Sequence, residues 1–226
     1  MSHFSPPIHS TGPAPDDQLL TTVRRLLPVR ALTYYEHLTL AERQADRLHQ
    51  LLGVHGPAAD FGWLLARQDV TVVVTPRWQM RGVSGITQFS NHGWTIGVNK
   101  GEPHARRRFT LAHELKHWLD GTRDTITYQS ISADQRERIA DYFAACYLMP
   151  ESWLRKAWKT GIQDPEALAG LFTVSLRAMQ TRLTYLQFLD DQPDRPVASY
   201  FRRHSLHQQA FTTSDDYFGT DRAEAA

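Results

Sequence analysis

The run His113-Glu-Leu-Lys-His117 constrains this chain more strongly than any other feature of its sequence. Residues four apart in a helix lie one turn apart on the same face, so both imidazoles can reach one metal ion. Glu114 lies beside them, where its carboxylate can take a proton from a water molecule that Zn²⁺ has acidified. The same pattern arises by chance on ordinary amphipathic helices. It therefore predicts a zinc site only if further ligands lie nearby.

A second pair of side chains, Glu137 and Asp141, offers those ligands. A catalytic zinc needs a third protein ligand and an open fourth position. The two carboxylates are also four residues apart, on the next predicted helix. If the two helices pack antiparallel, we expect Glu137 to be the third ligand. Asp141 would then accept the spare N–H of a zinc-binding histidine. Zinc is the default for this ligand set, which also suits other divalent metals.

The residues that flank the helical segments predict where the helices begin and end. Proline favours a first turn and glycine a stop, which predicts a helix over about 103–120. A capping-box pattern and a later proline predict the next helix over about 133–148. Thr39, with Glu42 three residues on, is expected to cap an earlier helix. The other expected helices cover 39–52, part of 60–67, 151–159, a segment opening at 165 and about 175–189.

A stretch upstream of the histidines has the character of β structure. Residues 70–75 form a β-branched run, and a Ser-Asn-His-Gly turn at 90–93 separates 85–89 from 94–98. These segments predict three strands, the last two forming a hairpin. We therefore expect an α+β fold. A small, mainly antiparallel sheet would lie beside a helical bundle that carries the metal site, with a C-terminal helix-turn-helix-like pair.

Composition limits the class of protein. Hydrophobic residues make up 41% and charged residues 22% of the 226 residues, which is normal for one globular domain with appendages. The formal net charge of +1 argues against a surface built mainly to bind phosphate backbones. The single cysteine, Cys146, fits a reducing compartment, and we expect it to be a buried small hydrophobe. Without a signal-peptide pattern or a long apolar run, we expect a cytoplasmic protein.

The two ends of the chain differ from its centre. Residues 1–17 are rich in Pro, Ser, Gly and His and are expected to be disordered. Residues 192–226 are polar and aperiodic and are expected to form a flexible tail. Between the expected catalytic domain, 18–160, and this tail, residues 161–191 form the helical pair.

Several stretches of the sequence resemble the ImmA/IrrE family of metallopeptidases. The most specific is a Phe-Ala-Ala…Leu-Met-Pro run at 143–150 that follows the two-histidine motif. The resemblance covers about residues 38–190. The matching stretches are 96–99, 106–117, 137–150 and 172–183.

The resemblance implies a gluzincin-like site, with His113, His117 and Glu137 as zinc ligands and Glu114 as the catalytic base. It also implies a protein substrate, a helix-turn-helix transcriptional repressor, whose cleavage switches on a mobile element or a stress response. The family usually has glycine where this chain has Lys116. We expect Lys116 to point away from the metal face, so that zinc binding tolerates it.

The C-terminal helical pair has two interpretations. Arg177, Gln180 and Arg182 on its second helix fit a DNA-reading helix-turn-helix. An apolar stripe at helical spacing instead favours packing on the core, as does the nearly neutral charge. The stripe consists of Leu176, Met179, Leu183 and Leu186.

Two other functions therefore compete with the peptidase. One is a DNA-binding regulator with a structural or vestigial metal site. The other is a peptidase-like scaffold that binds a repressor without cutting it, against which the intact Glu114 speaks. We expect neither direct nucleic-acid binding nor membrane association, and the oligomeric state stays open.

Three further residues have competing roles. His104 is expected to be an exposed first-turn residue rather than a ligand. His92, in the hairpin turn, could contact substrate, although a solvated turn residue is the simpler interpretation. Tyr128 could steady the oxyanion of a tetrahedral intermediate, and the sequence does not decide this.

Overall fold

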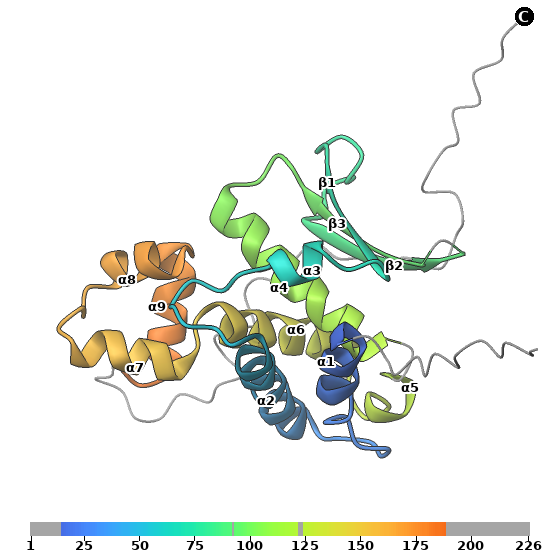
Figure 1. Cartoon of the computed structure of the whole chain (residues 1–226), viewed down its shortest axis with the longest axis horizontal. Helices are drawn as coiled ribbons and strands as arrows, with labels where there is room; N and C mark the ends of the chain where they lie inside the picture. Colours follow the sequence, from blue (N-terminus) through green and yellow to red (C-terminus); the bar gives the residue numbers. More distant parts are fainter. Residues whose placement is uncertain (1–14, 92, 122–123, 189–226) are drawn as a thin grey trace, which may run out of the picture.

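A computed structural model describes residues 15–91, 93–121 and 124–188 of the chain (Figure 1). The fold is α+β, as expected from the sequence. The described helices and strands are α1 (Pro15–Arg24), α2 (Tyr34–Leu52), α3 (Gly62–Leu65), β1 (Val70–Thr75), β2 (Gly85–Ser90), β3 (Gly93–Asn99), α4 (His104–Asp120), α5 (Asp124–Thr127), α6 (Ala133–Leu148), α7 (Glu151–Lys159), α8 (Pro165–Phe172) and α9 (Leu176–Tyr185).

The sheet is mixed, which corrects the expectation of a mainly antiparallel one. Its strand order is β1-β3-β2. Strands β2 and β3 form the expected antiparallel hairpin, and Gly93 takes a φ of 98° in its turn. Strand β1 pairs with the other edge of β3 and runs parallel to it. One of the two strand pairings is therefore parallel. The chain reverses direction before β2 and again after it, so β3 runs the same way as β1.

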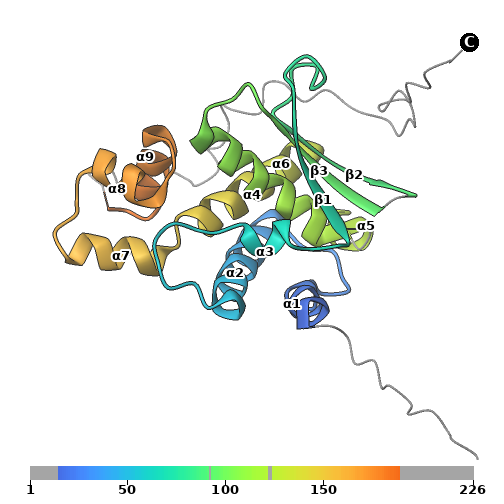
Figure 2. The same cartoon turned by 45° about the horizontal axis from the view of Figure 1, so that its top comes forward.

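Helix α4 lies between the sheet and the other helices. The sheet contacts α4 through β2 and β3, α6 packs against α4, and α2 packs against α6 (Figures 1 and 2). Both views place α7, α8 and α9 together at one end of the molecule, away from the sheet. Fully buried side chains such as Ile96, Leu115 and Phe143 join these layers into one core. Each contributes roughly 1.5–3 kcal/mol by leaving water.

The C-terminal pair of helices belongs to the same core. Phe172 of α8 and Met179 and Leu183 of α9 are fully buried in the main cluster. Asp164 caps α8 and Ser175 caps α9. None of the described helices combines the length and the apolar composition that crossing a bilayer requires.

Most predicted helix boundaries hold, and the exceptions have local causes. Helix α6 begins after Ser132, whose capping box with Gln135 is formed. Helix α2 begins five residues earlier than expected, because Thr33 and Glu36 form its capping box. Thr39 is therefore not the N-cap. Its hydroxyl instead donates to the carbonyl of Tyr35 one turn back.

Other differences concern the ends of the chain and one short helix. Helix α1 begins at Pro15, so residues 15–17 of the segment expected to be disordered are helical. Helices α1 and α5 are not expected from the sequence. Residues 1–14 and the expected tail, 192–226, lie outside the described residues.

Lys116 is buried in a polar network, with only 1% of the residue exposed. Its ammonium donates to both carboxylate oxygens of Asp120, at 2.6 and 2.7 Å, and to the side-chain oxygen of Gln44, at 2.9 Å. The Tyr128 hydroxyl donates to the same carboxylate. Burial lowers the pKa of Lys116, and the charge of Asp120 opposes that effect. Lys116 thus joins α4 to α2 and to the segment after α5.

We expect Asp120→Asn to destabilise the fold by about 3–5 kcal/mol, because it leaves the Lys116 ammonium buried without a counter-charge. Urea unfolding of the variant would measure this loss. Lys116→Met combined with Asp120→Asn should lose less than the sum of the single changes, since the two groups interact directly. Strict additivity would show that the ion pair contributes nothing to stability.

Candidate metal centre

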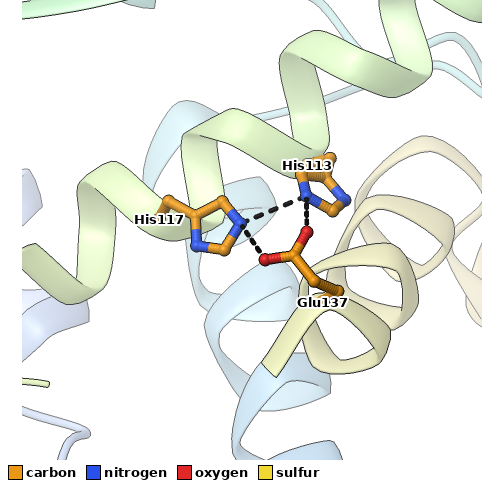
Figure 3. A group of neighbouring side chains, drawn as sticks. All are labelled: His113, His117 and Glu137. Carbon is orange, nitrogen blue, oxygen red and sulfur yellow. Dashed lines mark hydrogen bonds and ion pairs between the residues drawn. The ribbon is translucent and has the colours of Figure 1, made fainter. Parts of the chain in front are cut away.

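Helices α4 and α6 bring three potential metal ligands together. One ligand atom from each of His113, His117 and Glu137 lies within 4.8 Å of the other two (Figure 3). The two histidines project from successive turns of α4, and Glu137 reaches them from the first half of α6. Within the described part of the chain, this is the group of acidic, histidine or cysteine side chains that could hold an ion.

The direction of the two helices follows from the contacts. Glu137 lies near both histidines, whereas Asp141, one turn later on α6, contacts His113, the earlier histidine of α4. The two helices are therefore antiparallel. This is the arrangement that the two pairs of residues four apart require.

The distances between the three side chains are close to those around a tetrahedral ion, with the two oxygens of Glu137 each facing one histidine. Nε2 of His113 lies 3.1 Å from Nε2 of His117 and 3.2 Å from Oε2 of Glu137. Nε2 of His117 lies 3.6 Å from Oε1 of Glu137. Ligands about 2.0–2.1 Å from a tetrahedral Zn²⁺ are about 3.3 Å apart. Two imidazoles and a carboxylate at this spacing suit Zn²⁺ chemically, and they leave a fourth position for water or substrate.

Asp141 sets the orientation of one imidazole. Its Oδ1 lies 2.8 Å from Nδ1 of His113, on the side of the ring away from Glu137. A proton on Nδ1 can be donated to this carboxylate, which leaves the lone pair of Nε2 free for a metal. The contact is the one expected for Asp141 from the sequence.

The electrostatics of the group favour a positive charge at its centre. Burial alone would lower the pKa of His113, but hydrogen bonds to Asp141 and Glu137 outweigh it and raise that pKa to about 10. Burial, followed by the neighbouring charge of His113, lowers the pKa of His117. Burial would raise the pKa of Glu137, yet its hydrogen bond to His113 lowers it. The carboxylates of Asp141 and Glu137 thus stabilise positive charge at His113.

Glu114 lies beside the three potential ligands and does not belong to their group. It is 4% exposed, and its charge contributes to raising the pKa of His113. The hydroxyl of Thr87 on β2 donates to Oε2 of Glu114 at 2.7 Å. A carboxylate that lies beside a metal site without binding the metal is free to exchange protons.

Other candidates from the sequence lie elsewhere. His104 is exposed at the first residue of α4, nine positions before His113, as expected. Tyr128 is buried and its hydroxyl is engaged by Asp120, so it is not placed to contact an oxyanion at this site. Cys146 is buried on α6, where burial raises its thiol pKa to about 11. His92 lies outside the described residues.

Arg182 is not free to read DNA. It is 3% exposed, and its Nε donates to the carbonyl of Met149 at 3.3 Å. A guanidinium nitrogen lies 3.9 Å from Glu42, and the group covers the rings of Tyr142 and Tyr185. One of the three side chains that suggested a DNA-reading helix therefore holds α9 to the core.

The contact of Thr87 with Glu114 is not predicted from the sequence. It lies in the predicted hairpin, but nothing in the order of residues indicates which strand position faces Glu114. Only the packing of the sheet on α4 brings the two side chains together.

A family model and a solved structure are similar to this chain. A sequence model of the peptidase family M78, described as the IrrE N-terminal-like domain, matches residues 67–184. No curated protein matches the chain. A solved structure of a Mycobacterium tuberculosis transcriptional regulator is similar, with 20% identity and a TM-score of 0.48. The match covers 76% of this chain and 52% of that one, so the chain spans about half the length of that regulator.

The domain matched by the family model includes both histidines, Glu114, Glu137 and Asp141, and it extends over more than half of the 226 residues. The chain belongs to the ImmA/IrrE family of metallopeptidases.

Proposed function

We propose that the protein is a zinc-dependent endopeptidase. The observation that carries the proposal is the group of three potential ligands, His113, His117 and Glu137, within 4.8 Å of one another beside the buried carboxylate of Glu114. A structural zinc site is closed by four protein ligands, whereas this group has three. Membership of a peptidase family points to the same chemistry.

Each residue has a defined task in the proposed hydrolysis. A Zn²⁺ ion held by the three ligands would polarise the scissile carbonyl and lower the pKa of water. Glu114 takes the proton of the attacking water and later delivers it to the leaving amine. Asp141 holds His113 in the tautomer that presents Nε2.

Strand β2 offers a place for an extended substrate segment. It is an edge strand of the described sheet, and its Thr87 contacts Glu114. An extended peptide can hydrogen-bond to the free edge of a strand. By resemblance to the family, we propose that the substrate is a helix-turn-helix transcriptional repressor. A DNA-binding regulator with a vestigial metal site is the alternative, and the burial of Arg182 speaks against it.

The first test concerns the metal. Protein purified without chelator should contain about one zinc ion per chain, because three potential ligands lie close enough together to share one ion. His113→Ala and His117→Ala should each remove most of it, as measured by atomic emission. His104→Ala is the matched control and should keep the metal, since His104 lies exposed at the far end of α4. Wild-type protein without any metal would contradict the proposal.

The two carboxylates on α6 should differ in their effects. Glu137→Ala removes a ligand and should weaken zinc binding strongly. Asp141→Asn removes only the hydrogen-bond partner of His113, a change that typically costs about 10–100-fold in affinity or activity. Competition with a zinc chelator would rank the variants. Full zinc affinity in Glu137→Ala would mean that the third ligand is a different residue.

Glu114→Gln separates catalysis from metal binding. Glutamine keeps the size and accepts the Thr87 hydrogen bond, so zinc content and thermal stability should stay near those of the wild type. It cannot take a proton, and cleavage should fall by about 10²–10⁴-fold. Labelling of new protein N-termini in cells that produce either form would reveal the cleavage sites in whichever proteins are cut. A helix-turn-helix repressor should be among the proteins cut by the wild type alone.

Two outcomes of that experiment would count against the mechanism. New N-termini in equal amounts with Glu114→Gln would exclude Glu114 as the base. Loss of zinc from Glu114→Gln would make the residue a ligand or a support of the site.

The alternative function can be tested directly. We expect the isolated chain to show no sequence-specific binding to DNA from its own locus, since Arg182 is buried and the net charge is only +1. Mobility shifts with operator and scrambled DNA at several salt concentrations would check this. A sequence-dependent shift that survives physiological salt would favour the regulator instead.

A further inference from the structure

Strand β2 turns three alternate residues, Gly85, Thr87 and Phe89, toward the side of the sheet that α4 covers. They pair with Val98, Ile96 and Trp94 of β3, and Val98 and Ile96 are buried in the core. Thr87, at the middle position, contacts α4 at Glu114. Its Oγ1 lies 2.7 Å from Oε2 of the carboxylate and 3.2 Å from the backbone carbonyl oxygen of the same residue.

The side-chain carboxylate of Glu114 is a better acceptor for the Thr87 hydroxyl than the backbone carbonyl of Glu114. A threonine hydroxyl has one hydrogen to donate. The carbonyl of Glu114 lies inside α4, where it accepts the helical hydrogen bond from four residues later. A hydrogen bond to a charged oxygen is also shorter and about twice as strong as one between neutral groups. The distance of 2.7 Å agrees with that choice.

Gly85 confines the other oxygen of the carboxylate. A Cβ atom built on Gly85 would lie 2.6 Å from Oε1 of Glu114 and 2.4 Å from Cγ2 of Thr110. Real Cβ atoms do not approach other atoms so closely, so only glycine lets β2 lie this near to α4. The backbone of Gly85 therefore faces Oε1 while the hydroxyl of Thr87 binds Oε2. Because Glu114 is 4% exposed, little water can substitute for either contact.

We propose that Thr87 is the positioning residue of the catalytic base. It fixes the carboxylate of Glu114 from the strand side, while His113 and His117 leave the helix toward α6. The inference rests on the proposed peptidase function. General-base catalysis depends on such placement, since an error of about 1 Å costs about 10²-fold in rate. Thr87 acts on Glu114 and not on the contacts between the histidines and Glu137, so its effect should fall on turnover rather than on metal binding.

The first part of the test needs no substrate. Thr87→Val keeps the shape of the side chain and removes the hydroxyl, and Thr87→Ser keeps the hydroxyl. A double-mutant cycle of Thr87→Val with Glu114→Ala, followed by urea unfolding of the zinc-loaded protein, measures the coupling of the two residues. We expect Thr87→Val to lower the unfolding midpoint clearly when Glu114 is present and much less when it is absent. Equal shifts in both backgrounds would overturn the contact.

The second part measures catalysis on a peptide that spans a cleavage site found by N-terminal labelling. Thr87→Val should lower kcat by about 10–100-fold, the usual cost of losing a supporting contact, with KM and zinc content near the wild-type values. Thr87→Ser should restore most of kcat, which a merely structural role would not predict. Thr95→Val is the matched control, since Thr95 lies on β3 and on the opposite face of the sheet.

The outcomes distinguish this inference from the proposed function. Wild-type turnover in Thr87→Val, or no rescue by Thr87→Ser, would overturn the positioning role while the peptidase stands. If the wild type cuts nothing, the peptidase function fails and the catalytic role of Thr87 fails with it. The coupling in the unfolding cycle would then still establish or overturn the contact itself.

Discussion

Buried polar groups on helix α4 must find partners, and this requirement organises the rest of the structure. The helix lies inside the fold, where an unpaired charge costs several kcal/mol. Three side chains that lie close together on α4 are bound by partners from three different elements. His113 is bound by carboxylates of α6, Glu114 by the hydroxyl of Thr87 on β2, and Lys116 by Asp120 and by Gln44 of α2. Three elements near α4, namely α6, β2 and α2, thus each contribute a specific polar partner to it.

The sequence reveals the parts of this arrangement that depend on local spacing. Residues four apart share a helix face, so the order of His113, His117, Glu137 and Asp141 by itself indicates a site between two antiparallel helices. Capping residues are equally local, which explains why Ser132 predicts the start of α6 correctly. Thr39 shows the limit of such patterns, because a second capping box, six residues upstream, forms in its place.

The remaining features depend on packing between distant segments, which local patterns do not encode. Strand β1 carries no sign that it pairs with β3 rather than with β2, so the sequence does not predict the parallel pairing. For Lys116 the sequence predicts only that it points away from the metal face. That its ammonium is buried follows from Gln44, 72 residues away, and from Asp120. The contact of Thr87 with Glu114 arises in the same way, across 27 residues and two layers of the fold.

The two polar clusters on α4 differ in how their charge is balanced, and this difference separates stability from function. In the Lys116 cluster, a fixed ammonium meets one carboxylate, so the balance is internal to the protein and independent of any ligand. At the other cluster, Glu114, Glu137 and Asp141 surround two imidazoles, whose own protons offset that negative charge only in part. A divalent cation held by the proposed ligands would compensate it more fully, and such a site would exist only in the folded chain. The first cluster therefore holds the helix in place, whereas the second gathers acidic side chains whose negative charge a divalent cation at the proposed site would offset.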